Sequence, residues 1–174
     1  MGRNPSLHLV ILGENPAHAA GDVRGQLTQQ AAAWGLGDRI HLAGWVSAVE
    51  RTLVGLDFVV IPSTCRECCS RSLIESLCLG LPVVASDVGG NPELLRDDED
   101  GLLVPPGDPE RLSDALAALA SDAPLRRRLA IGALASRRRF DSLTVARRAA
   151  AVLRSPAVGA VGVTEAWEPV SAEP

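Results

Sequence analysis

The chain has 174 residues, about the length of one domain, and is 47% hydrophobic, which is enough apolar sequence to bury a core. Its formal net charge is −4, and an acidic balance of this kind argues against a general affinity for nucleic acid. The sequence contains no run of about eighteen apolar residues and no apolar core of a secretion signal near Met1, so we expect a soluble, cytoplasmic protein.

Apolar runs alternate with helical patterns along the chain. Short runs that predict buried strands occupy residues 7–12, 39–43, 58–61, 82–85 and 101–104. Helical patterns occupy residues 23–36, 47–56, the stretch that opens at residues 70–72, and residues 109–120 and 125–139. This alternation predicts an α/β fold with a Rossmann-like, doubly wound parallel sheet.

Residues 1–154 are expected to form one domain. Residues 155–174 lose the periodic pattern and are rich in Ala, Val, Gly, Glu and Pro, which predicts a disordered tail. In doubly wound sheets, ligands bind outside the carboxyl ends of the strands. Three loops of this chain follow strands in that way, at residues 13–16, 62–67 and 86–93.

Two carboxylates at a fixed spacing are the strongest chemical signal. Glu67 lies in the loop after the third strand, and Glu75 follows on the next helix. Between them, residues 70–72 open that helix, and the free N–H groups and positive dipole end of a helix suit a phosphate. A carboxylate one turn further on can accept two hydrogen bonds from a sugar diol. The layout therefore favours a nucleotide-sugar site.

The same stretch continues into two further motifs. The strand sequence GLPVV begins at Gly80, and the turn sequence GGNPE ends at Glu93. Together with the two carboxylates, which have seven residues between them, they make residues 62–103 resemble the donor-binding motif of retaining GT-B glycosyltransferases, the glycosyl transferases group 1 family. The resemblance extends from about residue 7 to about residue 140.

The resemblance implies a role for each matching residue. Glu75 would hold the ribose hydroxyls, and Glu67, the candidate catalytic residue, would contact the donor sugar and support the developing charge. The backbone at residues Ser70, Arg71 and Ser72 would meet the sugar and the diphosphate. Gly13 would let the backbone approach the nucleotide, although it is equally well explained as a turn glycine. The side chain of Arg71 has two open interpretations, contact with phosphate or exposure to solvent.

The implied chemistry is transfer of a hexose from a nucleoside diphosphate sugar with retention of configuration. The donor is a substrate, and the resemblance implies neither a cofactor nor an essential metal. The turn at Gly89, Gly90 and Glu93 would either approach the donor or serve only as a structural turn and helix cap.

The family's donor domain opens with one more strand–helix unit, which carries a Gly-Arg pair and a later Lys. This sequence does not match that unit and contains no Lys at all. We therefore expect an N-terminally truncated or split C-terminal half of a GT-B fold, with doubtful activity alone. Its expected partners are a nucleoside diphosphate sugar, a separate N-terminal acceptor domain and, through an exposed sheet edge, a second copy. A non-enzymatic nucleotide-sugar binding remnant or interaction module, or an epimerase-like fragment, is the alternative.

Cysteine and arginine clusters offer other functions. Cys65, Cys68, Cys69 and Cys78 lack a second ligand pair at zinc spacing, and we interpret them as simple thiols, not as a metal or redox centre. The arginine triplets at 126–128 and 137–139 fall on an apolar helical pattern, which favours a solvated helix face. Peripheral contact with an anionic membrane is the alternative.

Overall fold

A computed structural model describes residues 7–14, 21–65 and 68–154. Glu67 and the predicted tail at 155–174 therefore lie outside the described residues. The chain divides into two compact units, of which the first ends at Arg137 and the second begins at Arg138. Each unit is described by itself, and all the strands belong to the first.

Parallel strands form the framework of the first unit. The strands are β1 (Leu9–Leu12), β2 (Ile40–Gly44), β3 (Val59–Ile61), β4 (Val83–Ser86) and β5 (Gly101–Val104). Every pairing is parallel, with β1 on β2 and with β4 between β3 and β5. The predicted α/β fold with parallel strands is confirmed. Within the described part of the chain, however, the strands make two sheets. One contains β1 and β2, the other contains β3, β4 and β5, and no hydrogen bonds pair β1 with β3.

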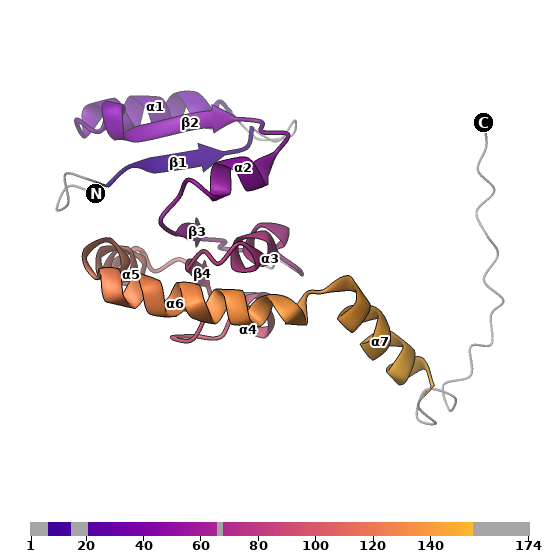
Figure 1. Cartoon of the computed structure of the whole chain (residues 1–174). Helices are drawn as coiled ribbons and strands as arrows, with labels where there is room; N and C mark the ends of the chain where they lie inside the picture. Colours follow the sequence, from indigo (N-terminus) through magenta and orange to yellow (C-terminus); the bar gives the residue numbers. More distant parts are fainter. Residues whose placement is uncertain (1–6, 15–20, 66–67, 155–174) are drawn as a thin grey trace, which may run out of the picture. The chain divides into compact units, whose positions relative to one another are not determined.

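The helices follow the predicted alternation with shifted ends. They are α1 (Val23–Ala33), α2 (Val49–Leu53), α3 (Arg71–Cys78), α4 (Asn91–Leu94), α5 (Pro109–Ser121), α6 (Ala123–Ser136) and α7 (Ser142–Leu153). Figure 1 shows α1 alongside the pair β1 and β2. The pattern predicted over residues 125–139 ends earlier as an α-helix, because residues 137–139 form a 3₁₀ turn. The sequence patterns did not predict α7.

Aspartates begin three helices of the first unit. The side chain of Asp22 accepts a hydrogen bond from the Gly25 N–H at 2.9 Å and so starts α1. Asp108 and Asp122 cap α5 and α6 in the same way, and each is followed within two positions by a proline. Caps of this kind satisfy N–H groups that a helix leaves without partners, and proline suits the first turn since it has no N–H.

The core is centred on β4. Val83, Val84 and Ala85 are fully buried, as expected for a strand with a partner on each side. Leu119 of α5 and Leu129 of α6 are also fully buried and pack with Val84 in one apolar cluster. Helix α3 adds its own fully buried apolar side chains and contacts both β3 and β4, so the three-stranded sheet fixes the position of α3.

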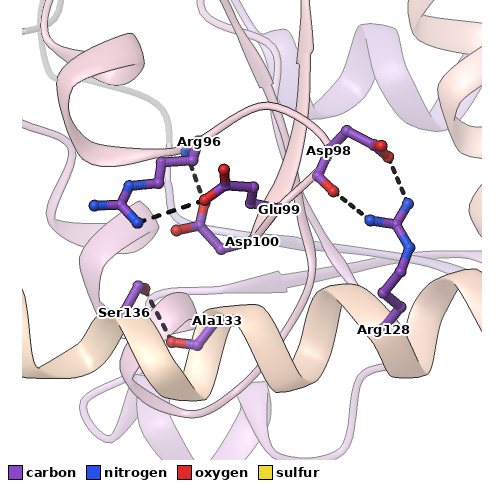
Figure 2. Close-up of polar contacts among 7 residues, drawn as sticks. All are labelled: Arg96, Asp98, Glu99, Asp100, Arg128, Ala133 and Ser136. Atoms are coloured by element: carbon purple, nitrogen blue, oxygen red, sulfur yellow. Dashed lines mark hydrogen bonds and ion pairs between the residues drawn. The ribbon is translucent and has the colours of Figure 1, made fainter.

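The turn before β5 is held to α6 by polar contacts (Figure 2). The buried carboxylate of Asp100 accepts a hydrogen bond from the Arg96 N–H at 2.7 Å. Arg128 of α6 donates to both the main-chain oxygen and the carboxylate of Asp98, whose φ of 59° is unusual for a residue other than glycine. These contacts tie the turn to the helix that covers the sheet.

The first arginine triplet is less solvated than the sequence suggested. Arg126 donates hydrogen bonds to the main-chain oxygens of Leu119 and Ala120 at the end of α5. Arg128 forms an ion pair with Asp98. Within this triplet, Arg127 is therefore the arginine that matches the predicted solvated helix face. Two of the three arginines therefore stabilise the fold.

Candidate functional site

The predicted anion site coincides with the start of α3. Ser70 is the N-cap residue, it is 1% exposed, and its hydroxyl accepts a hydrogen bond from the Leu73 N–H at 3.4 Å. The Ile74 N–H bonds to the Ser70 main-chain oxygen at 3.2 Å. Among the described residues, the N–H groups of Arg71 and Ser72 have no hydrogen-bond acceptor. Ser70 therefore anchors the turn and leaves two donors at the positive end of the helix dipole.

Arg71 and Glu75 form an ion pair on the surface of this helix. Their side chains are 3.5 Å apart, and 89% of the Arg71 side chain and 40% of the Glu75 side chain are exposed. The guanidinium of Arg71 is exposed and turned to Glu75, and both interpretations of this side chain stay predictions. A cation in the first turn is unfavourable for the helix dipole, and an Arg four residues before a Glu is the weaker order for such a pair. The pair is thus poorly placed for stabilising α3.

A second helical contact tightens the same turn. The hydroxyl of Ser76, which is fully buried, donates to the main-chain oxygen of Ser72 at 2.6 Å. Leu73 and Leu77, on the buried side of α3, are fully enclosed. The inner face of the helix is therefore rigidly packed, while Arg71 and Glu75 keep solvent access.

The predicted residue Gly13 lies at the carboxyl end of the neighbouring sheet. It is exposed, has a φ of 119°, and donates its N–H to the Gly44 main-chain oxygen at 2.8 Å. Gly44 ends β2 and has a positive φ of 70°. Both glycines are needed for backbone geometry, since L side chains rarely adopt these values. Among the described residues, no hydrogen bond or ion pair joins Gly13 to the start of α3.

The turn after β4 has a feature that sequence analysis missed. Asn91 is fully buried, and its side-chain N–H₂ group donates to the Ser86 main-chain oxygen at 3.0 Å. Its side-chain oxygen has no partner among the described residues. The positive φ of Gly89, 59°, turns the chain so that Asn91 can reach back to the strand. The motif GGNPE therefore shapes the backbone through its asparagine, and Glu93 lies exposed on α4.

Other predicted groups do not assemble into a second centre. In residues 7–14, 21–65 and 68–154, no three His, Cys, Asp or Glu side chains are grouped to hold a metal ion. Cys65, Cys68 and Cys69 are exposed, and no helix in the described part of the chain is long and apolar enough to cross a membrane. His8 and His41 contact each other across the paired strands β1 and β2, with ring nitrogens 3.1 Å apart. Sequence analysis did not predict this contact, because the two residues are far apart in the sequence.

Solved structures of glycosyltransferases share this fold. HepE of Anabaena in complex with UDP aligns with a TM-score of 0.80 and 27% identity, over 86% of this chain and 41% of HepE. The C-terminal domain of the group 1 protein LpcC from Francisella tularensis aligns with a TM-score of 0.71 and 28% identity, over 78% of this chain and 70% of that domain. The fold is therefore that of the Rossmann-like C-terminal half of a GT-B glycosyltransferase.

Sequence comparison gives the family. Residues 2–122 match the family described as glycosyl transferases group 1, and the chain belongs to it. The lipopolysaccharide core biosynthesis glycosyltransferase LpsE of Rhizobium meliloti is 32% identical over 130 residues, which is 75% of this chain and 36% of LpsE. The phosphatidyl-myo-inositol mannosyltransferase of Mycobacterium leprae is 37% identical over 123 residues, 70% of this chain and 32% of that protein. The chain thus spans about a third of the length of these sugar transferases.

Proposed function

We propose that this chain binds a nucleoside diphosphate sugar and forms the donor-binding part of a hexosyltransferase. The observation that carries the proposal is the start of α3, where Ser70 holds the turn, the Arg71 and Ser72 N–H groups have no acceptor among the described residues, and Glu75 follows one turn later. Anions bind to helix N-termini of this kind, and a carboxylate nearby adds recognition of hydroxyl groups.

The diphosphate is assigned to the start of the helix. Its oxygens would accept hydrogen bonds from the N–H groups of Arg71 and Ser72, and the dipole of α3 favours the negative charge. The guanidinium of Arg71 supplies a nearby cation in a chain that contains no Lys. Since that side chain is 89% exposed, it can turn from Glu75 to the phosphates without unpacking the core.

The ribose is assigned to Glu75. Its carboxylate accepts hydrogen bonds and is only half-exposed, so the ribose hydroxyls would replace Arg71 as its partner. Binding then exchanges one weak surface ion pair for two sets of charge-assisted contacts, Arg71 with phosphate and Glu75 with ribose. The unfavourable place of Arg71 in the first turn is explained by this exchange.

The reaction of the complete enzyme is proposed to be hexose transfer with retention. The bond from the anomeric carbon to the diphosphate oxygen breaks, the acceptor oxygen bonds to that carbon on the same face, and the acceptor proton passes to the departing diphosphate. Glu67 is proposed to face the donor sugar and support the developing positive charge. Because the chain spans about a third of its sugar transferase relatives, acceptor binding is assigned to further polypeptide.

The nucleotide is proposed to be uridine diphosphate, because HepE of Anabaena, a similar structure, has been solved with UDP and with UDP-glucose. Isothermal titration of the folded chain with UDP, GDP and ADP, and with the glucose, mannose and N-acetylglucosamine conjugates of each, tests the assignment. We expect the uridine nucleotides to bind at least tenfold more tightly than those of guanosine and adenosine, and the Glu75→Gln variant to lose that binding. If none binds to a chain that unfolds cooperatively, the proposed function is wrong.

A further inference from the structure

A pair of histidines spans the two strands of the first sheet. His41 is the second residue of β2, and His8 directly precedes β1. Val10 is the register partner of His41, and side chains two residues apart in a strand lie on the same face, so His8 and His41 share one face of the sheet. Leu9 and Ile40 lie on the other face, where they line a cleft with residues of α1. The imidazoles therefore lie on the face away from α1, and both residues are exposed.

The two rings contact each other through nitrogen atoms. Nδ1 of His8 lies 3.1 Å from Nε2 of His41, and the planes of the two rings differ by 7°. One of these nitrogens donates a proton and the other accepts it, because two N–H groups or two lone pairs would repel each other at this distance. The contact therefore brings two nitrogens that are able to bind a metal ion around one shared proton.

A change of tautomer frees both nitrogens for a cation. Neutral histidine can carry its proton on either ring nitrogen. When His8 carries it on Nε2 and His41 carries it on Nδ1, both facing nitrogens present lone pairs, and a cation takes the place of the shared proton. Because both residues are exposed, an ion can reach the pair from solvent, and the rings can turn to direct their lone pairs at it.

The spacing of the nitrogens fits one transition-metal ion. Bonds from zinc to histidine nitrogen are about 2.0–2.1 Å long, so two nitrogens 3.1 Å apart reach one ion at an angle of about 100°, close to the tetrahedral value of about 109°. Imidazole suits zinc, copper and nickel, whereas magnesium and calcium prefer oxygen ligands. The pair therefore selects a divalent transition-metal ion.

We propose that His8 and His41 bind one divalent transition-metal ion, such as Zn²⁺, through Nδ1 of His8 and Nε2 of His41. Water completes the coordination, since no three His, Cys, Asp or Glu side chains of the described residues are grouped to hold a metal ion. The ion cross-links β1 and β2 near the beginning of both strands, whereas the hydrogen bond between Gly13 and Gly44 joins them where they end.

The ion has a structural role, because its two ligands come together only in the folded chain. His8 and His41 are 33 positions apart in the sequence, and the pairing of β1 with β2 places them side by side. A ligand that binds the folded chain and not the unfolded one stabilises the fold. Zinc should therefore stabilise the pairing of these two strands.

NMR of the imidazole nitrogens during titration of the full chain with zinc sulfate at neutral pH tests the proposal. We expect the signals of Nδ1 of His8 and Nε2 of His41 to shift together, at the same zinc concentration. In His8→Asn, read at His41, the required concentration should rise at least tenfold, since one of two ligands is lost. His18→Asn changes the remaining histidine, which lies outside the described residues, and as the control it should leave the titration unchanged.

Thermal unfolding measures the structural role separately. Zinc should raise the unfolding temperature more in wild type than in His8→Asn, since zinc held by the exposed cysteines acts equally on both chains. Equal gains would contradict a cross-link between β1 and β2.

Three NMR results would overturn the site. The first is that neither ring shifts in excess zinc, and the second is that one ring shifts alone, as an isolated surface histidine does. The third is a shift at His8 that stays as sensitive to zinc in His41→Asn as in wild type. No nucleotide is present in these measurements, so their outcome is independent of the proposed function.

Discussion

Arg71 and Glu75 are paired across one turn of α3, with 3.5 Å between the guanidinium and the carboxylate. The pair joins the residue assigned to ribose with a cation at the helix start that is assigned to phosphate. The pair contributes little to the stability of the helix, because it is exposed and because Arg71 precedes Glu75. The positive charge of Arg71 also lies at the positive end of the helix dipole. Its arrangement suits a site in which both side chains change partners on binding.

The Glu75→Gln variant should bind nucleoside diphosphates at least tenfold more weakly. Hydrogen bonds to a charged group contribute about 1.5–3 kcal/mol, and about 1.4 kcal/mol is a tenfold change in affinity. Titration calorimetry measures the loss, and Glu110→Gln, on an exposed first-turn glutamate of α5, is the matched control. Equal losses in both variants would show that charge on the chain, and not the position of Glu75, decides binding.

The Arg71→Gln variant separates binding from stability. Its free energy of unfolding should change by less than about 0.5 kcal/mol, because exposed ion pairs contribute little and the helix dipole disfavours a cation there. Its affinity for nucleoside diphosphate should fall, and the dependence of affinity on salt should become shallower than in wild type. A large loss of stability with unchanged affinity would make Arg71 a structural residue.

The positions of most strands could be predicted, because a parallel strand that is buried on both faces has a continuous apolar sequence. The strand at Gly101–Val104 has the predicted bounds, and β4 differs by one residue at each end. The pairing could not be predicted, since an apolar run does not specify its neighbour. The meeting of His8 with His41 depends on that pairing and was hidden for the same reason.

Sequence analysis could predict the features of the candidate site that depend on neighbouring residues, but not the partners of its side chains. The position of Ser70 as an N-cap follows from residue type and from the helix pattern behind it. The partner of Arg71 was open because a long side chain can turn either way. Helix α7 was missed, although Asp141, whose carboxylate accepts a hydrogen bond from the Thr144 N–H at 2.9 Å, is a typical start signal.

Gly132→Ala should destabilise the first unit. A Cβ at Gly132 would lie 1.9 Å from the main-chain oxygen of Glu99, in the turn that Asp100 and Arg128 hold against α6. The backbone must shift to accept it, and overpacking of this kind costs about 1–3 kcal/mol. Chemical denaturation measures the free energy of unfolding of each variant.

Gly37→Ala is the matched control for that substitution. A Cβ at Gly37 meets no atom within 4 Å, and its φ is not in the left-handed region. Replacing such a glycine lowers the conformational entropy of the unfolded chain and stabilises by about 0.4–1 kcal/mol. The two substitutions should therefore change stability in opposite directions, and an unchanged stability in Gly132→Ala would mean that the turn at Glu99 yields easily.

The thiol of Cys78 should make the fold less stable at alkaline pH. Burial raises the pKa of Cys78, and the nearby charge of Arg137 only partly offsets this. Between the ordinary thiol pKa and the raised value, the folded chain keeps a proton that the unfolded chain has lost, so the free energy of unfolding falls as the pH rises through that window. Denaturation with a reductant present, between about pH 8 and pH 10, should show a steeper loss in wild type than in Cys78→Ala. Equal slopes would mean that the thiol ionises as easily in the folded chain as in the unfolded one.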